Sequence, residues 1–379
     1  MLLKNDGILP LESETTARIA VIGGYAQLGV PAGTGSSAVT PPGGYAAVVP
    51  VGGPGIMGLA RNLYLHPSAP LAELRKLLND QAGFSWQAGK PPQAAVEFDP
   101  GMSAAEAAML ARSCDVAVVF AIRVEGEGFD NPDLSLPWRQ DAVIEAVADV
   151  NPDTVVVLET GNPVAMPWHD EVRAIVQAWY PGQAGGQAIA EILTGTVNPS
   201  GRLPVTFPAS LTQVPRPELP GLGAPWGTPT TICYDEGAEV GYRWYARTGQ
   251  QPLYAFGHGL SYTSFSYSDL RAEGGDTVTV TFTVTSTGGR AGADVPQLYL
   301  TEAAGDRRMR LLGFGRVELQ PGRCRTLTVT ADPRLLARYD TGAGQWRISG
   351  GTHRIALGKA ADDLVLGADV QLAGRLFGE

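Results

Sequence analysis

Three carboxylates follow a strand-like run near the middle of the chain. Glu125, Glu127 and Asp130 lie in residues 125–130 (EGEGFD), directly after the run 115–122 (DVAVVFAI). In α/β folds, ligands bind in the crevice outside the carboxyl ends of the strands. A carboxyl group on a glycine-rich loop at this place can be carried into a pocket and serve as a proton donor. The segment therefore indicates acid–base chemistry, and a solvated turn is the alternative interpretation.

Strand-like runs alternate with helical patterns from residue 17 to about residue 210. The expected strands are 18–23, 115–122, 153–158 and 173–178, and the expected helices are 71–78, 104–112, 140–147 and 185–193. Ser103 and Glu106 have the spacing of a capping box that opens the second helix. The alternation predicts an α/β domain with a mostly parallel sheet sandwiched by helices.

A different pattern occupies the last hundred residues. Residues 277–285 alternate with period two between threonine and apolar side chains, as the strands of a two-layered sheet do. Further strand candidates, separated by glycine-rich and proline-containing turns, are 296–301, 311–319, 325–330, 344–348, 353–357 and 364–371. This spacing predicts an all-β sandwich of the fibronectin type III or immunoglobulin kind.

Composition narrows the classes of ligand. The chain has 379 residues and a formal net charge of −10, which argues against a nucleic-acid partner because phosphate binding needs clustered Lys and Arg. No run of 18 apolar residues occurs, so no membrane-spanning helix is expected. The scattered thiols and imidazoles have no metal-ligand spacing, and we expect no metal site and no cofactor; they are Cys114, Cys233, Cys324, His66, His169, His258 and His353.

Several further stretches are informative through their order along the chain. They are 3–11 (LKNDGILPL), 33–37 (GTGSS), 179–188 (WYPGQAGGQA), 198–208 (NPSGRLPVTFP) and 254–263 (YAFGHGLSYT). Each motif alone is weak. Together and in this order they resemble the C-terminal half of a glycoside hydrolase family 3 β-glucosidase, and the resemblance covers essentially the whole chain.

The resemblance implies a modular enzyme with an N-terminal (β/α)8-like barrel, a six-stranded α/β sandwich and often a fibronectin type III domain. Only the second and third modules have counterparts here. The domains expected on this basis are a linker that follows the barrel (1–16), the α/β sandwich (17–212), a connecting segment (213–272) and the fibronectin type III-like sandwich (273–379).

The family's acid/base glutamate stands in a setting like E-x-E-G-x-D-R ahead of an L-x-L-P stretch, which the resemblance matches to residues 125–131 and 134–137. Glu127 falls on the acid/base position, and Glu125 is the fallback. A retaining glycosidase needs two carboxyl groups about 5–5.5 Å apart. We expect enclosure against the barrel and nearby carboxylates to raise the pKa of Glu127. Asn131 replaces the family's arginine, which should weaken a local ion pair. Ser36 and Asp130 are the expected substrate contacts.

The resemblance places the nucleophile, an aspartate in an S-D-W-like context, on the barrel, and this chain has no such motif. We therefore expect the chain by itself to be inactive; if it were active, Glu125, Asp130 and Glu159 would be the candidate nucleophiles. Two alternatives stay open, namely a non-catalytic carbohydrate-binding or scaffold remnant, and an enzyme of the same family that acts on β-xylosides.

The expected partners follow from the same resemblance. They are β-linked glucosides or oligosaccharides and the barrel module of the same enzyme. A docking face without its barrel would expose apolar surface, so we expect the isolated chain to self-associate. The first residues do not resemble a signal peptide; a periplasmic or secreted location would require one upstream of the barrel.

Overall fold

The computed structural model describes residues 1–11, 16–52, 61–78, 94–127, 131–225 and 227–378. The chain forms two compact units. The first comprises Met1–Val197 with Gly221–Thr228, and the second comprises Asn198–Pro220 with Pro229–Glu379. Among the described residues, no helix is long and apolar enough to cross a membrane.

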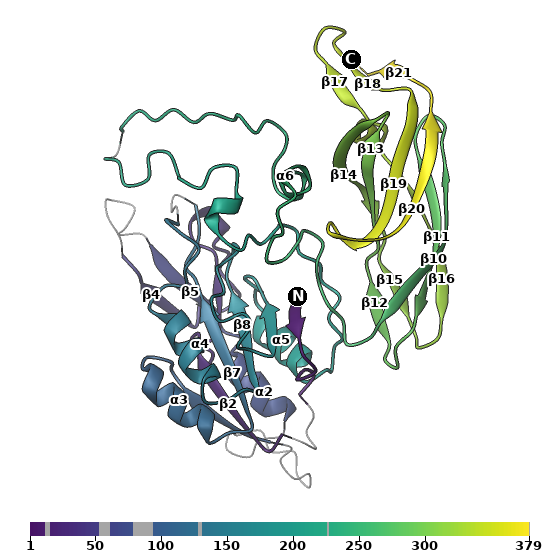
Figure 1. The fold of residues 1–379 in the computed structure, drawn as a ribbon. Helices are drawn as coiled ribbons and strands as arrows, with labels where there is room; N and C mark the ends of the chain where they lie inside the picture. Colours follow the sequence, from purple (N-terminus) through teal and green to yellow (C-terminus); the bar gives the residue numbers. More distant parts are fainter. Residues whose placement is uncertain (12–15, 53–60, 79–93, 128–130, 226, 379) are drawn as a thin grey trace. The chain divides into compact units, whose positions relative to one another are not determined.

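A six-stranded sheet forms the centre of the first unit (Figure 1). Its strands, in spatial order, are β1 (Leu2–Asn5), β9 (Ala174–Gln177), β8 (Thr154–Glu159), β7 (Val116–Ile122), β2 (Arg18–Gly23) and β6 (Ala95–Asp99). The five strands from β9 to β6 are parallel, and β1 runs antiparallel to β9. Every residue of β7 is buried, as expected for a central strand covered on both faces. The predicted α/β class is confirmed.

Four helices cover this sheet. They are α2 (Pro70–Leu77), α3 (Ala104–Arg112), α4 (Gln140–Ala148) and α5 (Gly185–Leu193). Helix α2 packs on α5 and α3 packs on α4, with β2 and β7 between the two pairs (Figure 1). The Ser103 side chain accepts a hydrogen bond from the backbone N–H of Glu106, which caps α3 as its sequence predicts.

A small antiparallel sheet lies next to the carboxyl end of β7. It consists of β3 (Val30–Ala32), β5 (Asn62–His66) and β4 (Ala47–Pro50), none of which the sequence pattern indicates. Leu63 and Leu65 of β5 pack in one buried cluster with Ile122 and Val124. This cluster attaches the loop that follows β3 to the loop that follows β7, which is the place of the predicted site.

Two segments expected to be connections contribute strands instead. β1 lies within 1–16 and pairs with the exposed edge of β9, and β10 (Phe265–Glu273) lies mostly within 213–272 and pairs with β11 (Thr279–Ser286). Residues 198–212 group with the second unit. The sequence gives little sign of either strand, because edge strands lack the continuous apolar pattern of central ones.

The second unit contains a β-sandwich. One sheet has the order β10–β11–β16, with β16 at Cys324–Thr330. The other has the order β14 (Asp306–Phe314), β13 (Gln297–Ala303), β19 (Gly351–Ala360) and β20 (Asp363–Leu372). Short strands complete the unit, namely β12 (Gly292–Asp294), β15 (Val317–Leu319), β17 (Arg338–Asp340), β18 (Gln345–Ile348) and β21 (Arg375–Phe377). The predicted all-β sandwich is confirmed.

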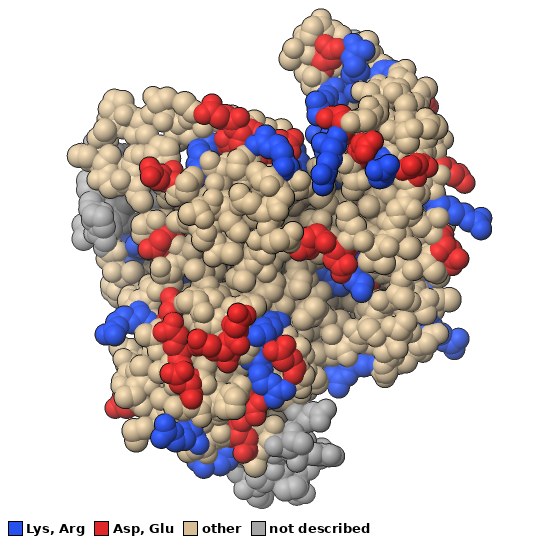
Figure 2. Space-filling view, viewed as in Figure 1, with Lys and Arg blue, Asp and Glu red and all other residues tan. Residues whose placement is uncertain are grey.

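Helix α6 (Tyr242–Thr248) precedes the sandwich and packs on β14 within the same unit. Figure 2 shows Lys and Arg side chains, with Asp and Glu between them, gathered over α6 and the neighbouring strands β13 and β14. A second short helix, α7 (Pro333–Leu336), also packs on β14. The two helices place backbone carbonyls and charged side chains on the same edge strand.

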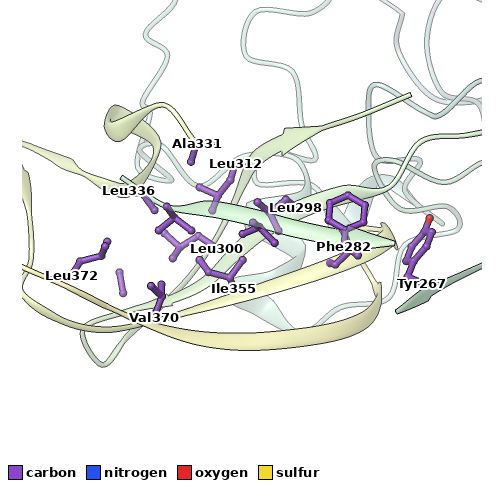
Figure 3. Packing of buried hydrophobic residues seen from close by; sticks show 14 of the residues in the cluster. Tyr267, Phe282, Leu298, Leu300, Leu312, Ala331, Leu336, Ile355, Val370 and Leu372 are labelled. Carbon is purple, nitrogen blue, oxygen red and sulfur yellow. The ribbon is translucent and has the colours of Figure 1, made fainter. Parts of the chain in front are cut away.

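The core of the sandwich is built from alternating apolar side chains of facing strands (Figure 3). Along β11, every second residue is buried, which matches the period-two sequence pattern. Phe282 of β11 has no exposed surface and lies in one cluster with Leu298 and Leu300 of β13 and with Ile355 of β19.

Phe282→Ala should lower the free energy of unfolding of the second unit by about 3–5 kcal/mol, because a buried aromatic ring is lost and a cavity remains. Hydrogen exchange measured by mass spectrometry would report this as faster exchange of β11 and β16, with β7 and β8 unchanged. Thr283→Ala, on the opposite face of β11, is the control. Equal protection in the Phe282→Ala variant and the wild type would contradict the assigned core.

Candidate active site

Glu125 is the most heavily bound carboxylate at the end of β7. Its side chain is 4% exposed, and its Oε2 accepts hydrogen bonds from the backbone N–H groups of Gly161 and of Asn162, the latter at 2.8 Å. These two residues form the turn that follows β8. The carboxylate therefore connects the ends of two neighbouring parallel strands.

Three side chains complete the environment of Glu125. Asn131 Nδ2 donates to Oε1 at 3.0 Å, and Arg123 Nε lies 3.7 Å from the same oxygen, with its side chain 5% exposed. The Tyr180 hydroxyl lies 2.5 Å from the Arg123 carbonyl and 3.5 Å from Glu125 Oε2. Burial, and then the charge of Glu125, raise the pKa of Tyr180, so the phenol stays protonated and can donate. This set of contacts engages both oxygens of Glu125 and argues against its fallback role as acid/base.

At position 131, asparagine takes the place of the family's arginine, and this changes how the neighbouring carboxylate is held. The neighbouring carboxylate is Glu125, and Asn131 donates a neutral hydrogen bond to it in place of an ion pair. The positive charge beside Glu125 comes from Arg123, whose Nη2 also donates to the Asp133 carbonyl at 2.6 Å. Buried carboxylates are retained when they are paired and hydrogen-bonded, and both conditions hold here.

The loop after β3 lies directly against the acidic loop. The Thr34 N–H donates to the Glu125 carbonyl at 3.0 Å, and Thr34 forms an isolated parallel bridge with Gly126. A Cβ at Gly126 would lie 2.0 Å from Thr34 Oγ1 and 2.5 Å from the Thr34 carbonyl oxygen. Only glycine fits this close approach of two backbones.

Glu127 is the carboxylate that remains exposed. It follows the bridge at Gly126, and its Oε2 accepts a hydrogen bond of 3.2 Å from the backbone N–H of Ser36. Ser36 lies in the 3-10 turn Gly35–Ser37, and the two residues expected to meet in the site, Ser36 and Glu127, are adjacent. The result is a solvent-accessible carboxylate that directly follows a backbone position held by the loop after β3.

The direction of the Glu127 pKa differs from the expected one. Hydrogen bonds from the Ser36 side chain and backbone lower the pKa of Glu127, because they favour the ionised form. The expected rise depended on enclosure by a barrel, and in this chain Glu127 faces solvent. Glu127 is therefore in its base form near neutral pH.

Two further carboxylates of the sequence analysis, Asp130 and Glu159, remain to be placed. Asp130 lies outside the described residues. Glu159, the last residue of β8, is fully buried, and neither carboxyl oxygen has a hydrogen-bond partner in the described part of the chain. Burial raises the pKa of Glu159 well above its ordinary value, which disfavours the ionised form that a nucleophile needs. No group of three or more His, Cys, Asp or Glu side chains among the described residues has the geometry to hold a metal ion.

Sequence reasoning missed the residues that hold Glu125. Arg123 directly follows strand β7, where the apolar pattern ends. The period of two places residues 123 and 125 on the same side of an extended backbone, and this was the one signal for their contact. Gly161, Asn162 and Tyr180 carry no local sequence signal for contact with a carboxylate at position 125. Their roles depend on three chain segments that meet only in the folded sheet.

The fold and the site together define a two-part chain, in which an α/β sandwich with an exposed glutamate after its central strand is followed by a fibronectin-like β-sandwich. The family model described as glycosyl hydrolase family 3 C-terminal domain matches residues 1–262, and the one described as fibronectin type III-like domain matches residues 294–361. The chain belongs to glycoside hydrolase family 3.

Named relatives agree with this assignment. The chain is 37% identical to thermostable beta-glucosidase B of Acetivibrio thermocellus, over 98% of this chain and 47% of that protein. It is 41% identical to a beta-glucosidase of Rhizobium radiobacter, over 71% of this chain and 34% of that protein. The chain thus spans about half the length, or less, of these relatives.

Solved structures show the same fold. The Bifidobacterium adolescentis GH3 beta-glucosidase superposes with a TM-score of 0.77 at 30% identity, over 98% of this chain and 51% of that one. Beta-glucosidase 3B from Thermotoga neapolitana, in complex with glycerol, superposes with a TM-score of 0.78 at 28% identity, over 100% of this chain and 53% of that one.

Ser36→Ala should raise the pKa of Glu127 towards the ordinary range of a glutamate, because the largest contribution to its depression comes from the Ser36 side chain. A pH titration of the carboxyl carbons by NMR on the 379-residue chain measures this shift. Ser113→Ala, at the far end of α3, is the control. An unshifted Glu127 titration in the Ser36→Ala variant would contradict the contact.

Gly126→Ala should destabilise the first unit by about 1–3 kcal/mol, because the added Cβ overlaps Thr34. The thermal unfolding midpoint of the first unit should fall, and amides of residues 30–37 should exchange faster. Gly289→Ala is the control, since a Cβ there meets no heavy atom within 4 Å. Identical melting of the two variants would show that the loops are not in contact.

Proposed function

We propose that this chain supplies the general acid/base of a retaining β-glucosidase, with Glu127 in that role. The observation that carries the proposal is the contrast between neighbouring carboxyl groups. Glu127 is exposed directly after the bridge at Gly126, Glu125 is buried and hydrogen-bonded at both oxygens, and Glu159 is buried without a partner among the described residues. Of these three, only Glu127 is free to exchange a proton with a substrate.

Retaining hydrolysis then requires a second carboxylate as nucleophile, about 5–5.5 Å from the acid/base. Glu125 is held by Arg123 and Asn131, and burial of Glu159 disfavours its ionised form, so neither suits this role. We infer that the nucleophile lies outside this chain, on the family's barrel. The barrel would also complete the sugar subsite.

Glu127 would act in two protonation states. As general acid it protonates the leaving-group oxygen, and as general base it then takes a proton from the attacking water. The hydrogen bond from the Ser36 N–H favours the ionised form of Glu127, which is the general base. Exclusion of water by a docked barrel, together with the charge of a nearby nucleophile, would raise the pKa of Glu127 and provide the acid form.

The substrate class is terminal β-D-glucosides. This inference rests on relatives that are named beta-glucosidases, and it favours glucosides over β-xylosides. Ser36 is the proposed rim residue beside Glu127, and Asp130 keeps its proposed role as a substrate contact from the family motif alone.

A chimera tests the proposal directly. The corresponding half of the Acetivibrio thermocellus beta-glucosidase B is replaced by this chain, and hydrolysis of p-nitrophenyl β-D-glucoside is measured. Glu127→Ala should lower turnover by about 10²–10⁴-fold, the usual contribution of a general acid–base group. Azide should restore part of the rate, because it can replace the base in the second step.

Matched variants separate this role from a structural one. Glu171→Ala, at an exposed glutamate, should keep full turnover, and the 379-residue chain alone should show none. Full turnover of the Glu127→Ala chimera would exclude Glu127 as acid/base. Turnover by the chain alone would place a nucleophile within it.

A further inference from the structure

The second unit contains a cleft of about 740 Å³ between α6 and β14. All of its lining residues belong to this unit. The volume is in the range of small-molecule sites, which is about 300–1,000 Å³. Its principal side chains come from the helix, from the segment that follows it and from the strand, namely Arg243, Tyr245, Arg247, Gln250, Arg307 and Arg308.

The cleft is cationic in an acidic protein. Its lining contains five arginines, which include Arg338, and three carboxylates. One of the carboxylates, Asp306, is already paired with Arg338. Figure 2 shows Lys and Arg gathered over α6 and β14 with Asp and Glu between them, whereas the chain as a whole has a net charge of −10. A local excess of positive charge favours an anionic ligand.

Two arginines of the cleft have no partner of their own. Within the described residues, the side chains of Arg243 and Arg307 make no hydrogen bond and no ion pair. Their neighbours on β14 are held in place, because Arg308 Nη2 donates to the Leu336 carbonyl at 2.6 Å and Arg310 Nη1 donates to the Ala337 carbonyl at 3.0 Å. Hydrogen bonds thus hold the arginines of β14 that neighbour the cleft, whereas the guanidinium groups of Arg243 and Arg307 can bind a ligand.

Electrostatics agree with this geometry. Burial, and then the charges of Arg310 and Arg338, lower the pKa of Arg308 to about 10. Burial and then Arg243 lower the pKa of Arg310. Both arginines are thus shifted mainly by burial and further by the neighbouring positive charges, and a bound anion would favour their charged forms.

Unpaired polar atoms indicate a ligand with hydroxyl groups. Thr206 Oγ1, Gln250 Oε1, Arg243 Nε and Arg308 Nε are buried and have no hydrogen-bond partner among the described residues, and all four side chains line the cleft. Buried polar groups without partners cost free energy. A polar ligand that drew these side chains into hydrogen bonds would remove that cost.

We propose that the cleft between α6 and β14 binds an acidic saccharide, a sugar that carries a carboxylate held by Arg243 and Arg307. Guanidinium groups bind carboxylates through charge-assisted, often bidentate hydrogen bonds. The requirement for an anion follows from the cleft itself. The choice of a saccharide rests on the proposed function, and a binding assay that needs no turnover keeps the two separate.

Isothermal titration calorimetry of the 379-residue chain at low ionic strength tests the proposal, with sodium glucuronate, sodium sulfate and glucose as probes. Glucuronate should bind, glucose should not, and sulfate should bind more weakly than glucuronate. Arg243→Gln and Arg307→Gln should each weaken glucuronate binding about tenfold or more, the loss expected for one charge-assisted hydrogen bond. The matched control, Arg325→Gln on exposed β16, should bind as the wild type does.

The outcomes separate the parts of the proposal. No glucuronate binding at about 50 mM, a concentration that reveals even millimolar affinity, would overturn it. So would equal weakening by Arg325→Gln, since net charge alone would then account for binding. Equal affinity for sulfate and glucuronate would overturn the saccharide assignment. If the Arg243→Gln and Arg307→Gln variants melt at the same temperature as the wild type, their weaker glucuronate binding results from the lost side chains in the cleft and not from unfolding.

Discussion

The hydrogen bonds to the Glu125 carboxylate are the constraint on which the candidate site depends. One side chain joins the stretch after β7, which includes Asn131, to the turn after β8 and to Tyr180, so that three separate segments of the chain meet at it. Arg123 supplies the charge that makes a buried carboxylate tolerable. Because both oxygens of Glu125 are engaged, the backbone that continues to Glu127 leaves the sheet from a fixed point.

The surroundings of Glu125, Glu127 and Glu159 differ, and this difference gives three identical side chains different acid–base properties. Glu125 is buried among donors, Glu159 is buried with no partner in the described part of the chain, and Glu127 faces solvent beside the Ser36 N–H. Such a separation of environments is how one protein assigns different tasks to identical side chains. In the proposed enzyme the barrel would contribute the remaining charges, so half of the chemistry lies in this chain.

The second unit combines an apolar core with a charged edge. Its sandwich core is apolar and regular, whereas its edge at β14 is covered by α6 and α7 and holds a cluster of arginines. Carbonyl groups around α7 stabilise Arg308 and Arg310 but leave the excess charge in place. A sandwich needs no such charge for folding, which is why the cleft is the natural place to look for a second ligand.

The amino-acid sequence alone was enough to predict the fold class, most of the central strands and the helices of the first unit. These features are local, since they depend on periodicity, on glycine and on motif order along the chain. Only the tertiary structure decided which of the two glutamates is held and which is free, because the donors to Glu125 come from Gly161, Asn162 and Tyr180, far along the chain. It likewise decided the edge strand β1 and the arginine cleft, since pairing at an edge and the approach of Arg243 and Arg338 to the arginines of β14 depend on segments that are far apart along the chain.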